Sequence, residues 1–267
     1  MDAAEDAVCR RARRRRNGPP GKLSEAQQRA AVGAVDDAEV AALAKGLGLA
    51  ALPQFFARGR RGAIYRAGHV AFKATPAAAD EALWLRRCNA FGVGPKLLAV
   101  GVSVLAMDFV DGPFIGRFLE TATDAAQVRA AVADLVAQCR ALDQRLVDKR
   151  EMARLHRSVL VVGARCVLLD FERACFRDRP SNLTGACQYL GSTWVAGRLR
   201  AFGLRVDVPA LRTAAAAYKT GHDSRDDAGG GFLDVLAALD LPPVICGDAA
   251  LLERRRRGAM TGSQRGI

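Results

Sequence analysis

The chain has 267 residues, of which 50 % are hydrophobic and 6 % aromatic, and its formal net charge is +12. This length can bury a sizeable core, in one two-lobed domain or in two small ones. No apolar run approaches the ~20 residues that span a bilayer, so a transmembrane helix is excluded and no membrane partner is expected.

Ten of the excess positive charges lie in arginine runs near the chain ends, at residues 10–16 and 254–257. Such runs are usually solvated tails, and they can also contact nucleic acid non-specifically or direct nuclear import. We therefore predict a basic flexible tail over residues 1–22 and a C-terminal extension, with the second run, over residues 223–267. Import into an organelle stays open, although the three acidic residues among the first six positions are unusual for a presequence.

The seven cysteines form no Cys-x-x-Cys pair, and the chain has only three histidines, so a structural zinc site is not expected. The odd cysteine count and the apolar neighbours indicate reduced, mostly buried thiols. This pattern predicts an intracellular protein, cytoplasmic or nuclear.

The N-terminal half is expected to begin with helices and to continue with strands. The predicted elements are a capped helix from residue 24, a second helix from residue 36 to the glycines at 46 and 48, a twisted hairpin over 55–73, a helix over 81–91, and two strands over 96–100 and 103–109. This succession predicts a small β-rich lobe with one helix, which we assign with the preceding helices to residues 23–110.

The C-terminal half begins with a chain break at residues 111–113 and is expected to be mostly helical. Asp124 can cap the longest helix, and its apolar face is formed by Val128, Val132, Leu135, Cys139, Leu142 and Leu146. A strand pair is expected next over 159–162 and 166–169, followed by helices over 188–202 and 209–219 and a weak helix before Pro242. We assign this second lobe to residues 111–222.

Two glycines precede a strand-like segment that ends in a lysine. Gly59 and Gly62 are followed by Ile64, and Lys73 closes the apolar segment 70–73 eleven residues after Gly62. Glycine lets backbone N–H groups approach phosphate oxygens because it has no Cβ, although such a pair more often marks only a tight turn. Unless Lys73 lies on a solvent edge, its ammonium group needs a phosphate or a carboxylate. Glu81 is the nearest candidate on the following helix, and its neighbour Asp80 is an equally good one.

An acidic, glycine-containing link at residues 107–112 follows the last strand of the β-rich lobe. Such a link can hold an adenine by backbone hydrogen bonds at Asp108 and Val110, with Met107 behind the ring. It can equally be a plain connector between lobes.

Asp170 follows an apolar run of three residues, in the segment Asp170-Phe171-Glu172. A carboxylate at the end of a buried strand is costly unless it meets a cation or donors, and magnesium bound to phosphates is a natural partner. Nineteen residues earlier, Glu151 follows the long helix. A loop residue there can orient or accept the proton of a substrate hydroxyl, or it is simply one charge beside the charged residues 148–150.

Together these segments resemble the protein-kinase-like core, and more narrowly an atypical group of predicted serine/threonine kinases known mainly from archaea. In that group Lys-x-Glu-Met stands in the catalytic loop and Asp-Phe-Glu replaces Asp-Phe-Gly. The counterparts in this chain are residues 59–64, Val70–Lys73, Glu81, Met107–Gly112, Lys149–Met152, Asp170–Glu172, Asn182–Thr184 and Gln188–Leu190. The resemblance covers residues 55–200 and implies an α+β, two-lobed protein-kinase-like fold with a small β-rich N-lobe and a mostly helical C-lobe.

The resemblance also implies ATP and Mg²⁺ as cofactors, with the nucleotide bound by Gly59, Gly62, Ile64, Lys73, Glu81, Met107, Asp108 and Val110. Within this set Lys73 would hold the α- and β-phosphates and pair with Glu81, across an unusually short connection. Ala57 stands where the first loop glycine is usual.

Asp170 would bind magnesium, and Glu151 would take the place of the catalytic aspartate. The asparagine that normally supports the metal has no clear counterpart, because counting from Glu151 gives His156 and counting back from Val159 gives Ser158. Three hypotheses follow: a serine/threonine protein kinase acting on an unidentified protein, a pseudokinase or nucleotide-binding module with little turnover, and a small-molecule phosphotransferase. The oligomeric state is not predicted.

Overall fold

The computed structural model describes residues 37–58, 62–221 and 231–243. The predicted helix from residue 24, both arginine runs and Gly59 lie outside the described residues. The chain divides into two compact units. The first contains the described parts of Met1–Arg87, Pro95–Val110 and Asp170–Phe176, and the second those of Cys88–Gly94, Asp111–Leu169 and Arg177–Ile267.

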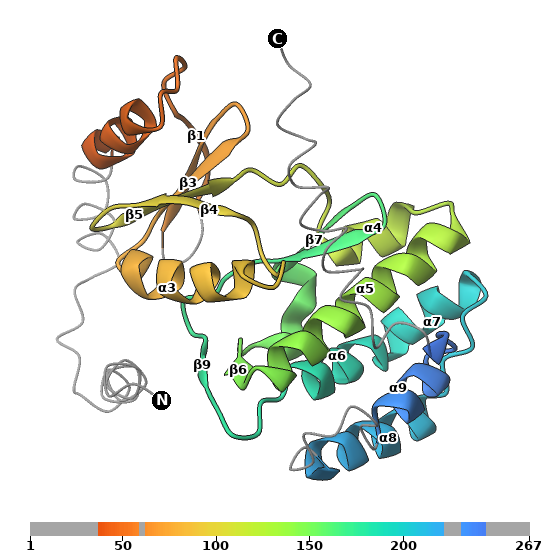
Figure 1. Ribbon diagram of the computed structural model, residues 1–267. Coiled ribbons are helices and arrows are strands. Elements are labelled where there is room, and N and C mark those ends of the chain that lie inside the picture. Colours follow the sequence, from red (N-terminus) through yellow and green to blue (C-terminus); the bar gives the residue numbers. More distant parts are fainter. Residues whose placement is uncertain (1–36, 59–61, 222–230, 244–267) are drawn as a thin grey trace, which may run out of the picture. The chain divides into compact units, whose positions relative to one another are not determined.

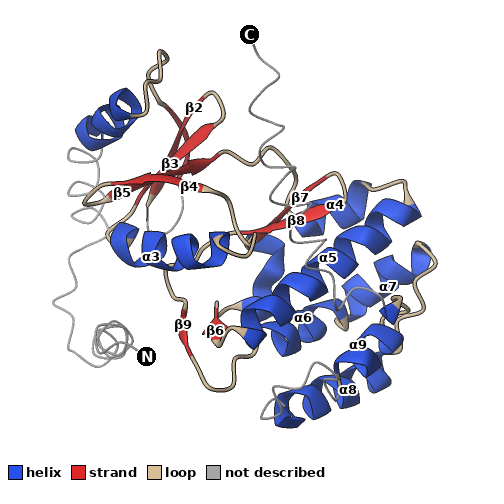
Figure 2. Cartoon of the chain, in the orientation of Figure 1, coloured by secondary structure: helices blue, strands red, loops and turns tan. Residues whose placement is uncertain are grey.

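The first unit contains a five-stranded antiparallel sheet (Figures 1 and 2). In spatial order its strands are β1 (Gln54–Arg58), β2 (Ala63–Ala67), β3 (Val70–Ala74), β5 (Val104–Asp108) and β4 (Leu97–Val100). These strands confirm the predicted hairpin and the predicted strand pair. Helix α3 (Ala78–Asn89) follows β3 and begins three residues before its predicted start.

One face of the sheet is covered by the helix at residues 37–46, whose Val40 and Ala44 pack in the core with Phe72. Glu39 fastens this helix to the turn between β4 and β5, where its carboxylate accepts hydrogen bonds from the N–H groups of Val102 and Ser103 and from the Ser103 hydroxyl. Burial raises the pKa of Glu39, but these hydrogen bonds outweigh it and hold the pKa below its usual value. The helix is thus an integral part of the first unit.

The second unit is mostly helical. Its elements are α4 (Ile115–Thr121), α5 (Ala125–Gln144), β6 (Val147–Asp148), the 3-10 helix η1 (Met152–Arg157), β7 (Val159–Val162), β8 (Arg165–Leu168), α6 (Asn182–Leu190), α7 (Thr193–Ala201), α8 (Val208–Thr220) and α9 (Phe232–Ala238). The short strand β9 (Cys175–Phe176) belongs to the first unit. A β-rich first unit and a helical second unit confirm the predicted α+β class.

Helix α5 is the central helix that the apolar pattern predicted. Asp124 caps it by accepting a hydrogen bond from the Ala126 N–H at 2.8 Å. The residues of the predicted face are fully buried as far as Leu142, whereas Leu146 lies beyond the helix end with a left-handed φ of 58°. Asp134 on the same helix accepts a hydrogen bond from the N–H group of Cys166 at 2.8 Å, which fixes β8 against α5.

One helix was not predicted, and one prediction of a helix was wrong. Helix α4 was not expected, because a helix of seven residues offers only the short apolar pattern of Ile115, Phe118 and Leu119. The single helix expected over 188–202 is two helices, α6 and α7. The chain leaves the helix at Gly191, and Ser192 has the extended backbone that suits a residue preceding a helix.

Helix α9 belongs to the second unit. Helix α9 packs on α8, with the rings of Phe232 and Tyr218 6.3 Å apart, and Phe232 is fully buried. The five described cysteines are free and buried, which confirms the expected reduced thiols for that part of the chain. Over the same residues, none of the helices combines the length and the apolar character needed to cross a membrane.

Candidate active site

Lys73 lies on the sheet face opposite the helix at residues 37–46. Strand register places Ile64, Lys73 and Leu105 directly across from one another, and Ala71 opposite Met107. Side chains alternate between the two faces of a strand, and the intervening residues of β3 pack in the core under the helix. Ile64, Ala71, Lys73 and Met107 therefore share one face.

The Lys73 ammonium group is shared by two carboxylates, in what we call the lysine cluster (Lys73, Glu81 and Asp170). Its Nζ atom lies 2.8 Å from Glu81 Oε2 and 2.6 Å from Asp170 Oδ1. Glu81 is buried, whereas the Asp170 side chain is 55 % exposed. The ion pair between Lys73 and Glu81 that the resemblance implies is present, and Asp80 is exposed.

A tight turn explains how Lys73 and Glu81 meet with so few residues between them. The Thr75 N–H group donates to the Ser103 carbonyl at 2.7 Å, and the Ala78 N–H group donates back to the Thr75 carbonyl at 3.1 Å. Helix α3 therefore begins three residues after Thr75 and places Glu81 in its first turn. The very short connection expected from the sequence is confirmed.

The charges of the lysine cluster depend on one another. Burial lowers the pKa of Lys73, but the neighbouring Glu81 and Asp170 outweigh it and raise the pKa above its usual value. Burial raises the pKa of Glu81, and Lys73 offsets part of that effect. The Lys73 ammonium group therefore stays charged at neutral pH. A charged ammonium beside a half-exposed carboxylate can bind phosphate oxygens and a divalent cation together.

Asp170 has a left-handed backbone with φ of 62°, which is uncommon for a residue other than glycine. The cost of such a conformation is of order 1–3 kcal/mol, and residues that bear it cluster at functional sites. The Phe171 N–H group donates to Glu81 Oε1 at 3.3 Å, so the segment is held by the same carboxylate that holds Lys73. The backbone geometry thus keeps the Asp170 carboxylate on Lys73.

Ser158 and His156 were the alternatives for a second magnesium ligand, and the two side chains differ in burial. The Ser158 Oγ atom is buried and has no hydrogen-bond partner among the described residues, whereas His156 is exposed on η1. The Ser158 carbonyl accepts the Leu169 N–H group at 2.8 Å. Whether either side chain serves a metal ion held by Asp170 stays a prediction.

Gly62 is explained by close packing within the sheet. A Cβ atom at this position would overlap the carbonyl oxygen of Ala74, so only glycine lets the chain pass. This requirement is independent of a ligand, and the predicted role of Gly62 beside phosphates stays a prediction.

The backbone N–H groups of the link after β5 differ in whether they are already hydrogen-bonded. The N–H groups of Asp108 and Phe109 donate to the carbonyls of Lys96 and His69, at 2.9 and 2.7 Å. No described residue accepts a hydrogen bond from Val110. A base at this link would therefore find its donor at Val110, and the role predicted for Asp108 is limited to its carbonyl.

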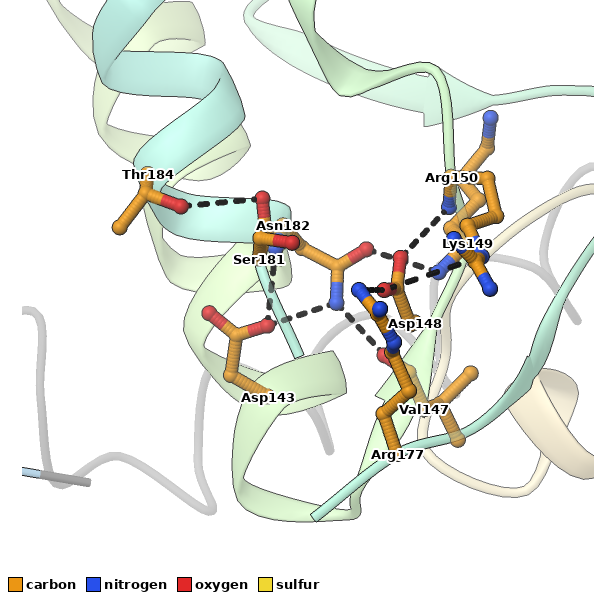
Figure 3. Close-up of polar contacts among 9 residues, drawn as sticks. All are labelled: Asp143, Val147, Asp148, Lys149, Arg150, Arg177, Ser181, Asn182 and Thr184. Carbon is orange, nitrogen blue, oxygen red and sulfur yellow. Dashed lines mark hydrogen bonds and ion pairs between the residues drawn. The ribbon is translucent and has the colours of Figure 1, made fainter. Parts of the chain in front are cut away.

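The predicted catalytic loop lies in the second unit and is fastened by Asn182 (Figure 3). The Asn182 side chain accepts the Lys149 N–H group at 2.9 Å and donates to the Val147 carbonyl and to Asp143, each at 2.6 Å. Asp143 and Asn182 are fully buried. Arg150 and Glu151, which follow Lys149, both have left-handed backbones, with φ of 70° and 56°. The hydrogen bonds of Asn182 therefore fix the backbone at Lys149, immediately before the left-handed residues Arg150 and Glu151.

Asp148 is shared by two arginines, in what we call the aspartate cluster (Asp148, Arg150 and Arg177; Figure 3). Its Oδ2 atom lies 3.0 Å from Arg177 Nη1 and 3.8 Å from Arg150 Nε, and its Oδ1 atom accepts the Arg150 N–H group at 3.0 Å. The carboxylate is buried, while both guanidinium groups are partly exposed. Glu151, the next residue, is exposed.

Sequence reasoning missed Asp143, Asp148 and Arg177. Asp143 interrupts the apolar end of α5, and a charge at such a position is a signal that it caps or anchors another segment. Asp148 was treated as one charge among several, and Arg177 lies 29 residues from it in the chain. Asn182 belonged to a resembling motif, but no role was assigned to it.

No protein-family model and no curated protein matches the chain. Among solved structures, it is similar to the ADP-bound aminoglycoside phosphotransferase APH(2'')-Ib, at 10 % identity and a TM-score of 0.42, over 76 % of this chain and 97 % of that one. A choline/ethanolamine kinase family protein from Mesorhizobium loti gives 13 % identity and a TM-score of 0.46, over 86 % and 94 % of the two chains. A streptomycin–ATP complex of APH(2'')-IIa gives 11 % and 0.42, over 75 % and 96 %. At these values the likeness carries no functional weight, and function is inferred from the residues of this chain.

Proposed function

We propose that this protein is an ATP- and magnesium-dependent phosphotransferase that moves the γ-phosphoryl group of ATP to a hydroxyl group. The observation that carries the proposal is the lysine cluster. A partly buried lysine on an apolar sheet face is held between a buried glutamate and a half-exposed aspartate with a strained backbone. That combination offers an ammonium group for phosphate oxygens and a carboxylate for their metal ion.

The sheet face supplies the rest of the nucleotide site. Ile64 and Met107 would contact the base, and Val110 N–H with the Asp108 carbonyl would bind its edge. Gly59 and Gly62 would line the phosphates. Lys73 would hold the α- and β-phosphates, with Glu81 keeping it in place.

Asp170 is the proposed magnesium ligand, and the resemblance implies Ser158 or His156 as the alternatives for a second one. When bound, the metal would neutralise charge that develops on the phosphate oxygens. In the transfer step the γ-phosphorus forms a bond to the acceptor oxygen while its bond to the β-phosphate oxygen breaks. Glu151 would orient the acceptor hydroxyl and take up its proton. Positioning and charge neutralisation would then account for most of the catalysis.

The acceptor we favour is a serine or threonine hydroxyl of a protein. This choice rests on the Lys149–Met152 segment, which resembles the catalytic loop of the atypical archaeal-type kinases. A basic loop is also a poor site for a polycationic small molecule, because like charges repel. Residues 145–157 contain five lysines and arginines against two carboxylates.

The test is transfer of label from γ-labelled ATP to the protein itself and to a panel of proteins and small hydroxyl compounds. Asp170→Ala should abolish transfer, while Asp80→Asn, an exposed carboxylate on the same unit, should leave it unchanged. Transfer by the Asp170→Ala variant at the wild-type rate would refute the proposal.

A pseudokinase is the second candidate, and the lysine cluster itself favours it. Lys73 lies 2.6 Å from Asp170, so a metal ion must compete with the ammonium group for that carboxylate. Stabilisation of the protein by ATP with magnesium, without transfer to any acceptor, would select this candidate.

A further inference from the structure

The aspartate cluster holds two guanidinium groups and one buried carboxylate. The Asp148 side chain is 3 % exposed, and the side chains of Arg150 and Arg177 are 31 % and 44 % exposed, although the Arg150 Nε atom is itself buried. A guanidinium group has five N–H donors, and the described contacts of Arg177 use one of them, on Asp148. Arg177 therefore offers further donors at the surface, and its ion pair with Asp148 holds the guanidinium group in position.

The surrounding loop strengthens this positive charge. Residues 145–157 carry a net charge of +3 with the histidine neutral. Arg154 and Arg157 on η1 are exposed, as is Arg179 in the segment after Arg177. Glu151, the proposed base, follows Arg150 directly in the chain. An acceptor that approaches Glu151 therefore meets several exposed arginines, among which Asp178 is an exposed carboxylate.

Guanidinium groups bind carboxylates and phosphates through paired hydrogen bonds, and exposed positive charge also attracts such groups from a distance. A guanidinium already oriented by a buried carboxylate loses less side-chain entropy when it binds an anion. Both effects favour an acceptor that carries a negative group near its hydroxyl.

We propose that Arg177 binds an anionic group of the acceptor, assisted by the charges of Arg154 and Arg157, and that the acceptor is an acidic or phosphorylated peptide segment. This proposal rests on the proposed function and narrows its substrate class. Arginine- or lysine-flanked hydroxyls would be poor acceptors, and so would aminoglycosides.

The test uses the full chain and three labelled serine peptides that differ only beside the serine, where they carry aspartates, a phosphoserine or lysines. Equilibrium binding is read by fluorescence polarisation, so the result does not depend on turnover. Wild type should bind the aspartate and phosphoserine peptides at least about tenfold more tightly than the lysine peptide, a difference of about 1.4 kcal/mol. Comparing the two anionic peptides distinguishes a carboxylate from a phosphate as the group recognised.

Arg177→Gln should weaken binding of the anionic peptides about tenfold and leave the lysine peptide unchanged. Arg177→Lys should recover only part of the loss, because lysine keeps the charge but not the paired donors. Arg212→Gln, which removes an exposed arginine of α8, should change nothing. Since Arg177→Gln also removes a partner of buried Asp148, the exposed pair Arg154→Gln/Arg157→Gln provides a second test with little risk to folding. It should weaken the same two peptides and reduce their salt dependence.

Equal binding of the three peptides by wild type, or tighter binding of the lysine peptide, overturns the proposal even if the protein transfers phosphate. Competition by a single-stranded oligonucleotide that outmatches both anionic peptides also overturns it, since the arginine surface would then serve nucleic acid. Failure of phosphate transfer with intact selectivity for the anionic peptides would instead count against the proposed function alone.

Discussion

The lysine cluster and the aspartate cluster have central charges of opposite sign. In the first unit one partly buried cation, Lys73, is shared by two carboxylates, and in the second unit one buried carboxylate, Asp148, is shared by two arginines. The first arrangement has an excess negative charge and suits a metal ion, and the second has an excess positive charge and suits an anion. Each unit thus uses one central charge to orient two others, of which at least one is partly exposed.

Breaking the centre of the lysine cluster should have the largest effect on activity. Lys73→Ala leaves Glu81 and Asp170 without their shared cation and removes the proposed phosphate contact. Phosphate transfer should fall on the order of 10²–10³-fold, the usual cost of a lost preorganised charge. Single-turnover transfer from labelled ATP measures this, with Lys45→Ala as an exposed control. A loss of less than about threefold would contradict the role given to Lys73.

Removing the anchor of the catalytic loop should mainly reduce stability. Asn182→Ala removes the hydrogen bonds that this side chain makes with the Lys149 N–H group, the Val147 carbonyl and the buried Asp143 carboxylate, and each buried group left unsatisfied costs about 1–3 kcal/mol. Urea denaturation should show this loss in the free energy of unfolding. Thr184→Ala, one turn away on α6, is only half-buried and should cost much less. Equal stability of the two variants would mean that Asn182 does not anchor the loop.

Asp148→Asn should moderately lower the stability of the protein. The two arginines lose their countercharge, while the side chain keeps its shape. We expect a loss of about 1–3 kcal/mol in the free energy of unfolding, since the hydrogen bonds that this residue makes are charge-assisted. Asp178→Asn, an exposed carboxylate beside Arg177, is the matched control and should change stability little. If both variants were equally stable, the buried carboxylate would not organise the two arginines.

The smallest effect should come from Glu39, which lies in neither cluster. Its folded-state pKa is lower than the ordinary value of 4.5, so the unfolded state binds more protons and stability rises with pH in this range. The contribution is therefore complete above pH 4.5 and is lost as the pH falls through the lower folded-state pKa. Thermal melts should show that Glu39→Gln loses less stability than wild type on acidification. A steeper loss in Glu39→Gln would reverse the sign and contradict the hydrogen bonds seen at Ser103.

The two clusters also differ in how far sequence reasoning could find them. Lys73 and Asp170 each end a short run of β-formers, and a charged residue in that position is conspicuous in a sequence. The pairing of Lys73 with Glu81 needed only the next helix. Strand content and the long helix were predictable for the same reason, because periodic apolar residues dominate those segments.

The aspartate cluster was not predictable in this way, because Asp148 stands in a charged segment where no single residue is conspicuous. Its partner Arg177 is distant in the chain, and only folding brings the two together. Likewise, the break between α6 and α7 depends on two residues, Gly191 and Ser192, inside an otherwise helical pattern. Long-range polar contacts and short breaks are set by tertiary packing, which one sequence does not reveal.

The most direct test of the lysine cluster is the thermal stability of the full chain with and without ATP and magnesium. Wild type should be stabilised by about 2.7 kcal/mol at a nucleotide concentration of about one hundred times the dissociation constant. Asp170→Ala should show little or no stabilisation by the same mixture, while Asp80→Asn should behave as wild type. No stabilisation of the wild type, or equal stabilisation of Asp170→Ala, would contradict a nucleotide-metal site at Lys73, Glu81 and Asp170.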